Sequence, residues 1–291
     1  MLVSLRDRLL LMQPSWLPTL LLIPFLYGIG WVLAQPIARP GWSAEDVSLL
    51  GTLFSFLLFL VVLPSWIQVR WRVKHPWSAL GLRGGRRAGR PPLVQAFFGG
   101  LLWAILLLVL IVVPILIGSW GHWLGEASIS RCVNALLLML GVGLAEELIF
   151  RGWLWEELDQ LLGGSAGVIG QALIFSLVHT RFNLGLMPML GLLTGLFLLG
   201  LALAVRRRLD QGSLWGCIGL HGGLVAGWHL IESGLLQLSP DVPVWLAGPG
   251  GLHPNPLGGA VAIAALFLLL VVQFTVVAKA ARPVSGARET S

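Results

Sequence analysis

Charged residues and cysteine are both scarce in this chain of 291 residues. Only 11% of the residues are charged, 56% are hydrophobic and the mean hydropathy is +0.86, so a soluble fold could not cover its surface with polar groups. The two cysteines, Cys132 and Cys217, form no CxxC pair. They exclude a zinc finger and a disulfide-rich secreted domain, and they permit at most one disulfide. These absences together indicate a membrane protein.

The chain instead contains long apolar runs. Spanning about 30 Å of hydrocarbon takes about 20 helical residues. Eight runs approach that length, so we predict an all-α fold, a polytopic membrane helix bundle of about eight transmembrane helices. The first run is counted as a helix because it is broken by Pro18 and Pro24 and lacks the small-x-small site of a cleaved signal peptide. The predicted spans are 16–35, 48–69, 93–117, 132–158, 166–181, 184–205, 213–231 and 258–278.

The basic residues indicate how these spans are oriented. If the N-terminus lies inside, 16 of the 19 Lys and Arg residues fall in cytoplasmic segments, and only Arg39, Arg131 and Arg181 fall outside. An excess of Lys and Arg in short loops marks the cytoplasmic side, so we expect an even number of spans with both termini cytoplasmic. The basic residues assigned to the inside are Arg6, Arg8, the seven between Arg70 and Arg90, Arg151, Arg206 to Arg208, Lys279, Arg282 and Arg288.

Composition changes most clearly between Arg70 and Pro92, where Gly, Arg and Pro predict a flexible cytoplasmic loop in contact with anionic lipid. Because the basic clusters lie between apolar runs, they favour membrane topology over nucleic-acid binding. The predicted organisation is 1–92 for peripheral helices and the basic loop, 93–131 for a third transmembrane helix and an external loop, 132–231 for the core, and 232–291 for an external loop, the last helix and a cytoplasmic tail.

Two groups of side chains are assigned to the cytoplasmic ends of spans. The first is a set of tryptophans interpreted as an interfacial belt, namely Trp66, Trp71, Trp77 and Trp215. The second follows the fourth span and is interpreted as a solvated rim and a candidate substrate entrance, namely Glu156, Glu157 and Asp159. At the outer end of the seventh span, His229 and Glu232 are interpreted as polar groups at a hydrated helix end.

Ionisable residues inside the apolar runs indicate a functional or structural role, because a charge in the bilayer costs about 2.5 to 3.5 kcal/mol on insertion scales. The fourth run carries Glu146, Glu147 and Arg151. Glu147 and Arg151 are four residues apart and share a helix face, so they can form a structural ion pair. Glu146 is rotated by about 100° from Glu147 and points elsewhere. We therefore predict that Glu146 is free for chemistry.

Two histidines lie in other apolar runs, His179 in the fifth and His221 in the seventh. At about 1.5 Å per residue their depth matches that of Glu146, provided that the fourth helix continues past Arg151. A carboxylate and two imidazoles support hydrolysis in two ways. They bind a divalent metal such as zinc, with His179, His221 and Glu146 as ligands, or Glu146 acts as a general base without metal. The signature HExxH is absent, so a metal site would be assembled from separate helices.

These residues also occur in a recognisable order. The order is EExxxR, FxxxH and a third motif that begins with histidine, corresponding to Glu146, Glu147, Arg151, Phe175, His179 and His221. Over about 130–231 the chain resembles the CPBP family of multi-pass intramembrane endopeptidases, also called the Abi or CAAX-protease-like family. The resemblance implies hydrolysis of a peptide bond near the end of a membrane-associated protein or peptide.

The resemblance also implies roles for the residues. Glu146 would activate water, His179 would assist it or bind the metal, and His221 would bind the metal or support the oxyanion. Structural support of the site would come from Glu147, Arg151 and Phe175. The family often has Asn four residues after the histidine of the third motif, where this chain has Val225, and the loss of that amide weakens the oxyanion role.

Two functions remain open. The first is an intramembrane endopeptidase, with or without a metal, whose partners are a membrane-associated substrate and the lipid bilayer but no nucleic acid. The second is a non-proteolytic protein of the same fold, a membrane partner or bacteriocin-immunity protein whose polar centre is structural. A transporter is disfavoured because no inverted repeat is visible. For both functions we expect an integral, multi-pass protein of the plasma membrane or another internal membrane, with its oligomeric state left open.

Overall fold

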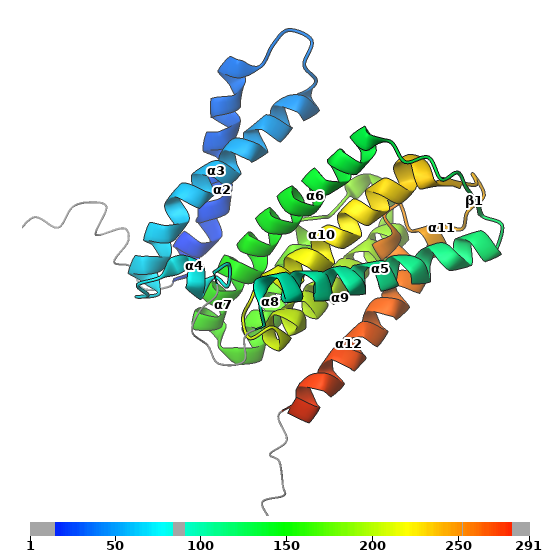
Figure 1. Ribbon diagram of the computed structural model, residues 1–291. Helices are drawn as coiled ribbons and strands as arrows, with labels where there is room; N and C mark the ends of the chain where they lie inside the picture. Colours follow the sequence, from blue (N-terminus) through cyan, green and yellow to red (C-terminus); the bar gives the residue numbers. More distant parts are fainter. Residues whose placement is uncertain (1–14, 84–90, 252, 281–291) are drawn as a thin grey trace, which may run out of the picture.

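The chain folds into a helical bundle with one N-terminal hairpin set beside it (Figure 1). The computed structural model describes residues 15–83, 91–251 and 253–280, without the side chains of 278–280. Its elements are α2 (Trp16–Ala34), η1 (Gln35–Ile37), α3 (Ala44–Arg70), α4 (Pro76–Ala79), α5 (Leu93–Ile117), β1 (Gly121–Trp123), α6 (Ile129–Glu147), η2 (Leu148–Leu154), α7 (Trp155–Leu162), α8 (Gly164–Leu177), η3 (Phe182–Leu184), α9 (Leu186–Leu209), α10 (Trp215–Leu230), η4 (Ile231–Leu235), β2 (Leu236–Leu238), α11 (Val244–Ala247), η5 (Pro256–Gly258) and α12 (Ala260–Ala280).

The all-α prediction is confirmed, apart from a short antiparallel pairing of β1 with β2. Within the described ranges, six helices are long and apolar enough to cross a membrane, rather than eight. The predicted span 166–181 corresponds to α8, which has only 14 residues and at 1.5 Å per residue is about 21 Å long, short of the roughly 30 Å hydrocarbon layer. The predicted span 213–231 corresponds to α10, which has 16 residues, continues into the π-helical η4 and is not among the six candidate spans. The orientation of the termini stays a prediction.

The helix that carries His221 lies at the centre of the bundle. α10 packs against α5, α6 and α9 (Figure 1). A Cβ at Gly219 would lie 2.1 Å from the carbonyl oxygen of Phe97 in α5, and one at Gly222 would lie 2.3 Å from that of Met139 in α6. Glycine is needed at both positions because the backbones approach so closely. The sequence around His221 therefore places this residue inside the bundle.

The fourth predicted span is longer than expected. α6, η2 and α7 form one continuous helix of 34 residues, Ile129–Leu162. Its middle part, η2, is π-helical, a form of helix that is frequent at functional sites. The chain therefore stays helical past Arg151, which is the condition for Glu146 to reach the depth of the two histidines. Glu146 lies about 26 Å from one end of this helix and about 24 Å from the other.

The α2–α3 hairpin docks on α7 through Glu157. This carboxylate is 0% exposed and accepts hydrogen bonds from four side chains of the hairpin and its C-cap. The donors are Thr19 Oγ1 at 2.7 Å, Trp66 Nε1 at 2.8 Å, Trp71 Nε1 at 2.8 Å, and Arg70 Nη2 at 2.8 Å. Because the charge is surrounded by donors, its burial is compensated.

Two predictions for this end of the bundle are wrong. Glu157 does not belong to a solvated rim, because its side chain is fully buried under the hairpin. Trp66 is not an interfacial residue, because it is buried, bonds to Glu157 and packs edge-on against Trp153 of η2 at a centroid distance of 6.4 Å. The partners of Glu157 lie 86 to 138 residues away in the sequence, so local patterns do not reveal them.

The predicted flexible loop is packed where it begins. Leu80, just after α4, is 0% exposed, and its burial fixes the segment. The carbonyl oxygen of Gly81 accepts from Leu214 N at 3.1 Å, and that of Leu82 accepts from Trp215 Nε1 at 2.9 Å. The flexibility predicted here is thus wrong up to Leu82. Outside the described residues lie 84–90 of this loop and the predicted cytoplasmic residues Arg6, Arg8, Arg282 and Arg288.

Candidate active site

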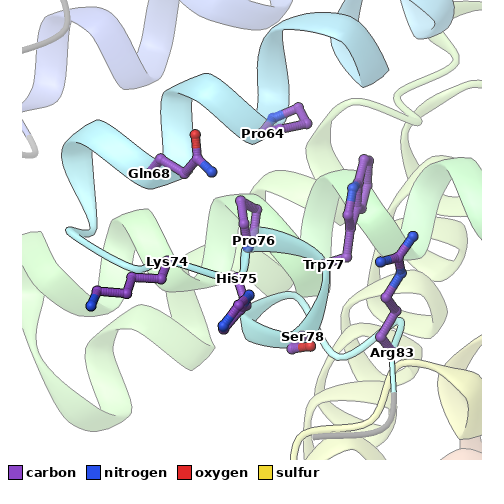
Figure 2. A pocket seen from close by; sticks show the side chains of 8 residues that line it. All are labelled: Pro64, Gln68, Lys74, His75, Pro76, Trp77, Ser78 and Arg83. Carbon is purple, nitrogen blue, oxygen red and sulfur yellow. The ribbon is translucent and has the colours of Figure 1, made fainter.

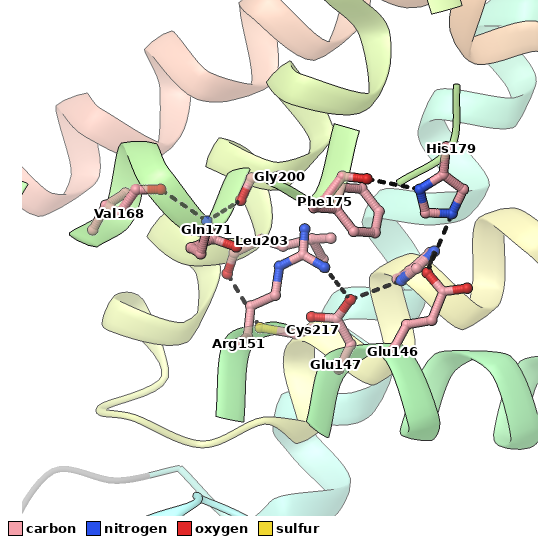
Figure 3. A network of polar contacts seen from close by, with 11 residues as sticks. Glu146, Glu147, Arg151, Val168, Gln171, Phe175, His179, Gly200, Leu203 and Cys217 are labelled. Atoms are coloured by element: carbon pink, nitrogen blue, oxygen red, sulfur yellow. Dashed lines mark hydrogen bonds and ion pairs between the residues drawn. The ribbon is translucent and has the colours of Figure 1, made fainter. Parts of the chain in front are cut away.

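The structure brings together all six residues predicted for the site (Figure 3). They come from four stretches of helix and from the turn after α8. α6 ends with Glu146 and Glu147, η2 carries Arg151, α8 carries Phe175 and is followed by His179, and α10 carries His221.

Glu147 connects three of these stretches. Arg151 Nη1 donates to Glu147 Oε1 at 2.8 Å, and both side chains are 0% exposed, so the predicted ion pair is present. The guanidinium of Arg151 also lies 4.1 Å from the ring centroid of Phe175, a cation–π contact. His221 Nδ1 lies 2.7 Å from the same Glu147 Oε1. Glu147 therefore orients His221 while Arg151 balances its charge.

The hydrogen bonds of the two histidines define which nitrogen faces the site. His179 Nδ1 lies 2.7 Å from the carbonyl oxygen of Phe175, so Nδ1 carries the hydrogen, because a carbonyl only accepts. Glu147 Oε1 accepts from Arg151, so His221 Nδ1 is likewise assigned as a donor to the same oxygen. The Nε2 atoms of His179 and His221 lie 3.7 and 3.8 Å from Glu146 Oε2. These distances are too long for direct hydrogen bonds and fit a bridging water.

Glu146 differs sharply from the adjacent carboxylate. Its side chain is 26% exposed, whereas that of Glu147 is 0% exposed. Among the described residues, Glu146 Oε2 has no hydrogen-bond partner. The neighbouring glutamates are thus divided into one that an arginine and a histidine hold through Oε1 and one whose buried Oε2 lies near two histidine nitrogens without a direct hydrogen bond. This division agrees with the expectation from their spacing, while the catalytic roles stay predictions.

A cavity of about 300 Å³ borders His221 and follows α10. Val225, one helical turn beyond His221, lines this cavity. An amide at that position, which the family often has, would face the same space. Here the position is apolar, so it contributes no hydrogen-bond donor beside His221.

A second cavity, of about 250 Å³, lies between the end of α3 and the segment around α4 (Figure 2). Its lining includes the basic residues Lys74, His75 and Arg83 but no carboxylate. It shares no lining residue with the first cavity. None of the six site residues lines it, whereas His221 lines the first cavity, so the first cavity is the one that borders the candidate active site.

Sequence reasoning missed two residues that support the site. Arg207, interpreted only as a topology signal, is 7% exposed and donates to the carbonyl oxygen of Arg151. Gln171 donates from Nε2 to the carbonyl oxygen of Gly200 at 3.2 Å, which joins α8 to α9. An amide inside an apolar run was a signal for Gln171. The partner of Arg207 is 56 residues away, and no local pattern points to it.

Glu146, His179 and His221 have the donor atoms that zinc prefers, and each histidine uses Nδ1 to bond a second group, as metal ligands do. Their placement is less suitable. Across 15–83, 91–251 and 253–280, no group of three or more His, Cys, Asp or Glu side chains could hold a metal ion. As placed, these residues do not fit a metal, and metal dependence stays a prediction.

Comparisons with known proteins assign two parts of the chain. Residues 128–227 match the family described as Type II CAAX prenyl endopeptidase Rce1-like, and residues 5–75 match a domain of unknown function, DUF8676. No curated protein and no solved structure matches. The segment 128–227 contains all six site residues. With this match and six candidate spans, the chain is a multi-pass integral membrane protein.

Proposed function

We propose that this chain, which carries an Rce1-like domain of the CPBP family at residues 128–227, is an intramembrane endopeptidase. Its substrate is a peptide bond near the end of a membrane-associated protein or peptide. The observation that carries the proposal is the environment of Glu146. This partly exposed carboxylate faces the Nε2 atoms of two histidines, each of which is oriented by a hydrogen bond at Nδ1.

The proposed reaction uses a water molecule between Glu146 Oε2 and His179 Nε2. Glu146 takes one proton from this water, while His179 Nε2 accepts a hydrogen bond from the other hydrogen. The oxygen then adds to the peptide carbonyl, and His221 in its protonated form donates from Nε2 to the oxyanion. Glu146 finally passes its proton to the leaving nitrogen as the C–N bond breaks. Glu147 holds the His221 ring throughout.

The direct test compares Glu146→Gln with the unchanged protein on a panel of membrane-tethered peptides. Turnover should fall about 10²- to 10⁴-fold, the contribution of a positioned acid–base group, with unchanged thermal unfolding. Glu156→Gln is the matched control, because Glu156 is a half-buried glutamate further along the same continuous helix. Activity retained by Glu146→Gln would reject the catalytic assignment.

The two histidines sharpen this test. If they act with Glu146 as one unit, His179→Ala and His221→Ala should each remove most turnover, and double variants should lose little more. Independent, additive losses would contradict a single centre. The folded state of each variant is checked by its thermal unfolding.

Metal dependence is a separate proposal for the same centre. It predicts that chelation removes activity, that zinc restores it, and that His179→Ala lowers the metal bound per protein. Full activity after exhaustive chelation, with no metal detected, would favour Glu146 acting on water without a metal.

A second candidate function is a non-proteolytic membrane partner, such as a bacteriocin-immunity protein. The apolar Val225 beside His221 favours it, because it removes a donor from the oxyanion side of the cavity. In that case Glu146→Gln would leave protection of cells unchanged, and the purified protein would cleave none of the peptides. For both functions the partners proposed are a membrane-associated protein or peptide and the bilayer.

A further inference from the structure

The three arginines at the end of α9 have different surroundings. Arg206 pairs with Asp210, four residues further along the chain, at a distance of 2.7 Å. Arg208 is exposed. Arg207 is turned into the bundle and is only 7% exposed. Because arginine is rarely buried without a specific partner, the placement of Arg207 indicates a role beyond the topology signal of the triplet.

The contacts of Arg207 lie on the helix that carries the two site glutamates. Arg207 Nη1 donates a hydrogen bond to the carbonyl oxygen of Arg151 in η2. The guanidinium carbon Cζ of Arg207 also lies 5.0 Å from the ring centroid of Trp155, the residue with which α7 begins. Trp155 is 8% exposed, so both contacts are made inside the protein. Arg207 therefore holds this helix on both sides of the boundary between η2 and α7.

The π-helical form of η2 explains why the carbonyl of Arg151 takes a donor from another helix. The N–H of Trp155 donates to the carbonyl oxygen of Phe150, five residues back. In an α-helix it would donate four residues back, to Arg151. The wider turn thus withdraws the donor that an α-helix would supply, and the guanidinium of Arg207 donates there instead. Arg207 therefore stabilises η2 in its π-helical form.

The side chain of Arg151 carries this effect to the candidate active site. Arg151 Nη1 donates to Glu147 Oε1, and the same oxygen lies 2.7 Å from His221 Nδ1 (Figure 3). The contacts thus run from Arg207 through Arg151 and Glu147 to His221. All four residues are buried, so water has little room to replace a lost contact. A displacement of Arg151 would therefore disturb the orientation of the His221 ring.

We propose that Arg207 is a positioning residue of this centre. By holding η2 in its π-helical form, it keeps Arg151 and Glu147 in the arrangement that orients His221. The kinetic consequence rests on the proposed endopeptidase function. Arg207 lines neither of the two cavities, so it is not placed to contact a substrate. Its loss should therefore slow the chemical step and leave substrate binding nearly unchanged.

Arg207→Met tests the proposal, and Arg208→Met is the matched control. Arg208 carries the same charge one residue later, and its Cζ lies 5.4 Å from the centroid of the same Trp155 ring. On a membrane-tethered peptide, Arg207→Met should lower kcat by about 10- to 100-fold with KM nearly unchanged, since a displacement of about 1 Å can cost that much. Arg208→Met should retain its kcat. Equal kcat values for the two variants would overturn the proposal, and so would a loss confined to KM.

Further variants separate positioning from packing. Arg207→Lys still has a donor and should retain more kcat than Arg207→Met, whereas equal losses would mean that the hydrogen bond is not what matters and would reject the proposal. If Arg207→Met does not fold, Arg207→Gln takes its place, because it keeps a polar side chain that is too short for the same contact.

The route through Arg151 is tested in a double variant. In Arg151→Leu the side chain no longer pairs with Glu147, so adding Arg207→Met should lower kcat little further. The comparison is made per folded molecule, with the folded fraction taken from thermal unfolding. A second loss as large as that of Arg207→Met alone would show that Arg207 acts independently of Arg151 and would overturn the proposed route.

A measurement without turnover separates this inference from the proposed function. Protein with isotopically labelled histidine gives imidazole N–H signals in NMR spectra, and the signal of His221 is assigned by its absence from His221→Gln. Arg207→Met should shift or broaden the Nδ1–H signal of His221, and Arg208→Met should leave it in place. An unchanged signal in folded Arg207→Met would overturn the positioning role even if the endopeptidase is active. A shifted signal beside a fully active Glu146→Gln would support the positioning of His221 and reject the endopeptidase mechanism.

Discussion

Glu147 and Glu157 lie on one continuous helix, and both carboxylates are 0% exposed and contact an arginine that is also 0% exposed. The arginine of Glu147 is Arg151, four residues further along the same helix. The arginine of Glu157 is Arg70, 87 residues earlier in the chain. The first pair was predictable from its spacing, and the second was not. The two pairs therefore separate what local sequence determines from what tertiary packing determines.

The pairs also differ in what their remaining partners do. The second contact of Glu147 is His221, so this carboxylate orients a residue of the proposed catalytic centre. The other contacts of Glu157 are a hydroxyl and two indoles of the segment that matches DUF8676. Glu157 itself lies in the Rce1-like segment, so it joins the two matched segments. A buried charge does not by itself indicate catalysis. Its contact partners show whether it belongs to the proposed catalytic centre or to a structural contact.

The largest effect on stability is expected for Glu157→Ala. Breaking a fully buried pair costs about 3 to 5 kcal/mol, and here the indole and hydroxyl donors lose their acceptor as well, which places the cost at the upper end. Thermal unfolding and limited proteolysis of the hairpin measure it. Because Glu157 is outside the candidate active site, turnover per folded molecule should be retained.

The control for this variant is Glu156→Ala, which removes the neighbouring, half-buried glutamate and should leave unfolding nearly unchanged. Equal unfolding temperatures for the two variants would show that the Glu157 contacts do not hold the hairpin. A large loss of turnover in folded Glu157→Ala would mean that Glu157, like Glu147, supports the candidate active site.

The next effect in size is that of Arg151→Leu. It leaves Glu147 buried with only His221 as a partner, so the cost should lie at the lower end of about 3 to 5 kcal/mol. Unlike Glu157→Ala, it should also reduce turnover, because the orientation of His221 depends on Glu147. Arg151→Lys keeps the positive charge, so it should lose less stability and less turnover than Arg151→Leu. Unchanged unfolding of Arg151→Leu would mean that Arg151 acts elsewhere, for example on a substrate carboxylate.

The sequence predicted more of the candidate site than of its surroundings. The site depends on local spacing, as in Glu147 and Arg151, and on three ordered motifs whose helices converge. Helix periodicity could not show that Arg70 reaches Glu157, or that Arg207 reaches the backbone of Arg151, because both contacts form only when distant helices pack. The lengths of the apolar runs also overestimated how far a helix extends, since α8 ends at Leu177, before the predicted residue 181.

A smaller effect is expected for Trp71→Phe, which keeps the ring and removes one donor to Glu157. Hydrogen bonds to charged groups contribute about 1.5 to 3 kcal/mol. Trp215→Phe is the matched comparison, because its indole donates to the neutral carbonyl of Leu82, a contact worth about 0.5 to 1.5 kcal/mol. Thermal unfolding of both variants should rank Trp71→Phe as the more destabilised. The reverse order would mean that the charge of Glu157 does not strengthen its hydrogen bonds.

The smallest effect is expected for Glu126→Gln, which removes the negative charge of an exposed ion pair and keeps the hydrogen bond from Arg131 Nη1 to the carbonyl oxygen of residue 126. Arg131 Nη1 lies 3.5 Å from Glu126 Oε2, and the two side chains are 34% and 64% exposed. Water and salt screen such pairs, so the cost should be about 0.2 to 1 kcal/mol and should shrink as the salt concentration rises. Thermal unfolding at low and high salt measures both quantities. A salt-independent loss as large as that of Arg151→Leu would show that exposure does not separate weak from strong pairs in this protein, and the contrast drawn from Glu147 and Glu157 would need another cause.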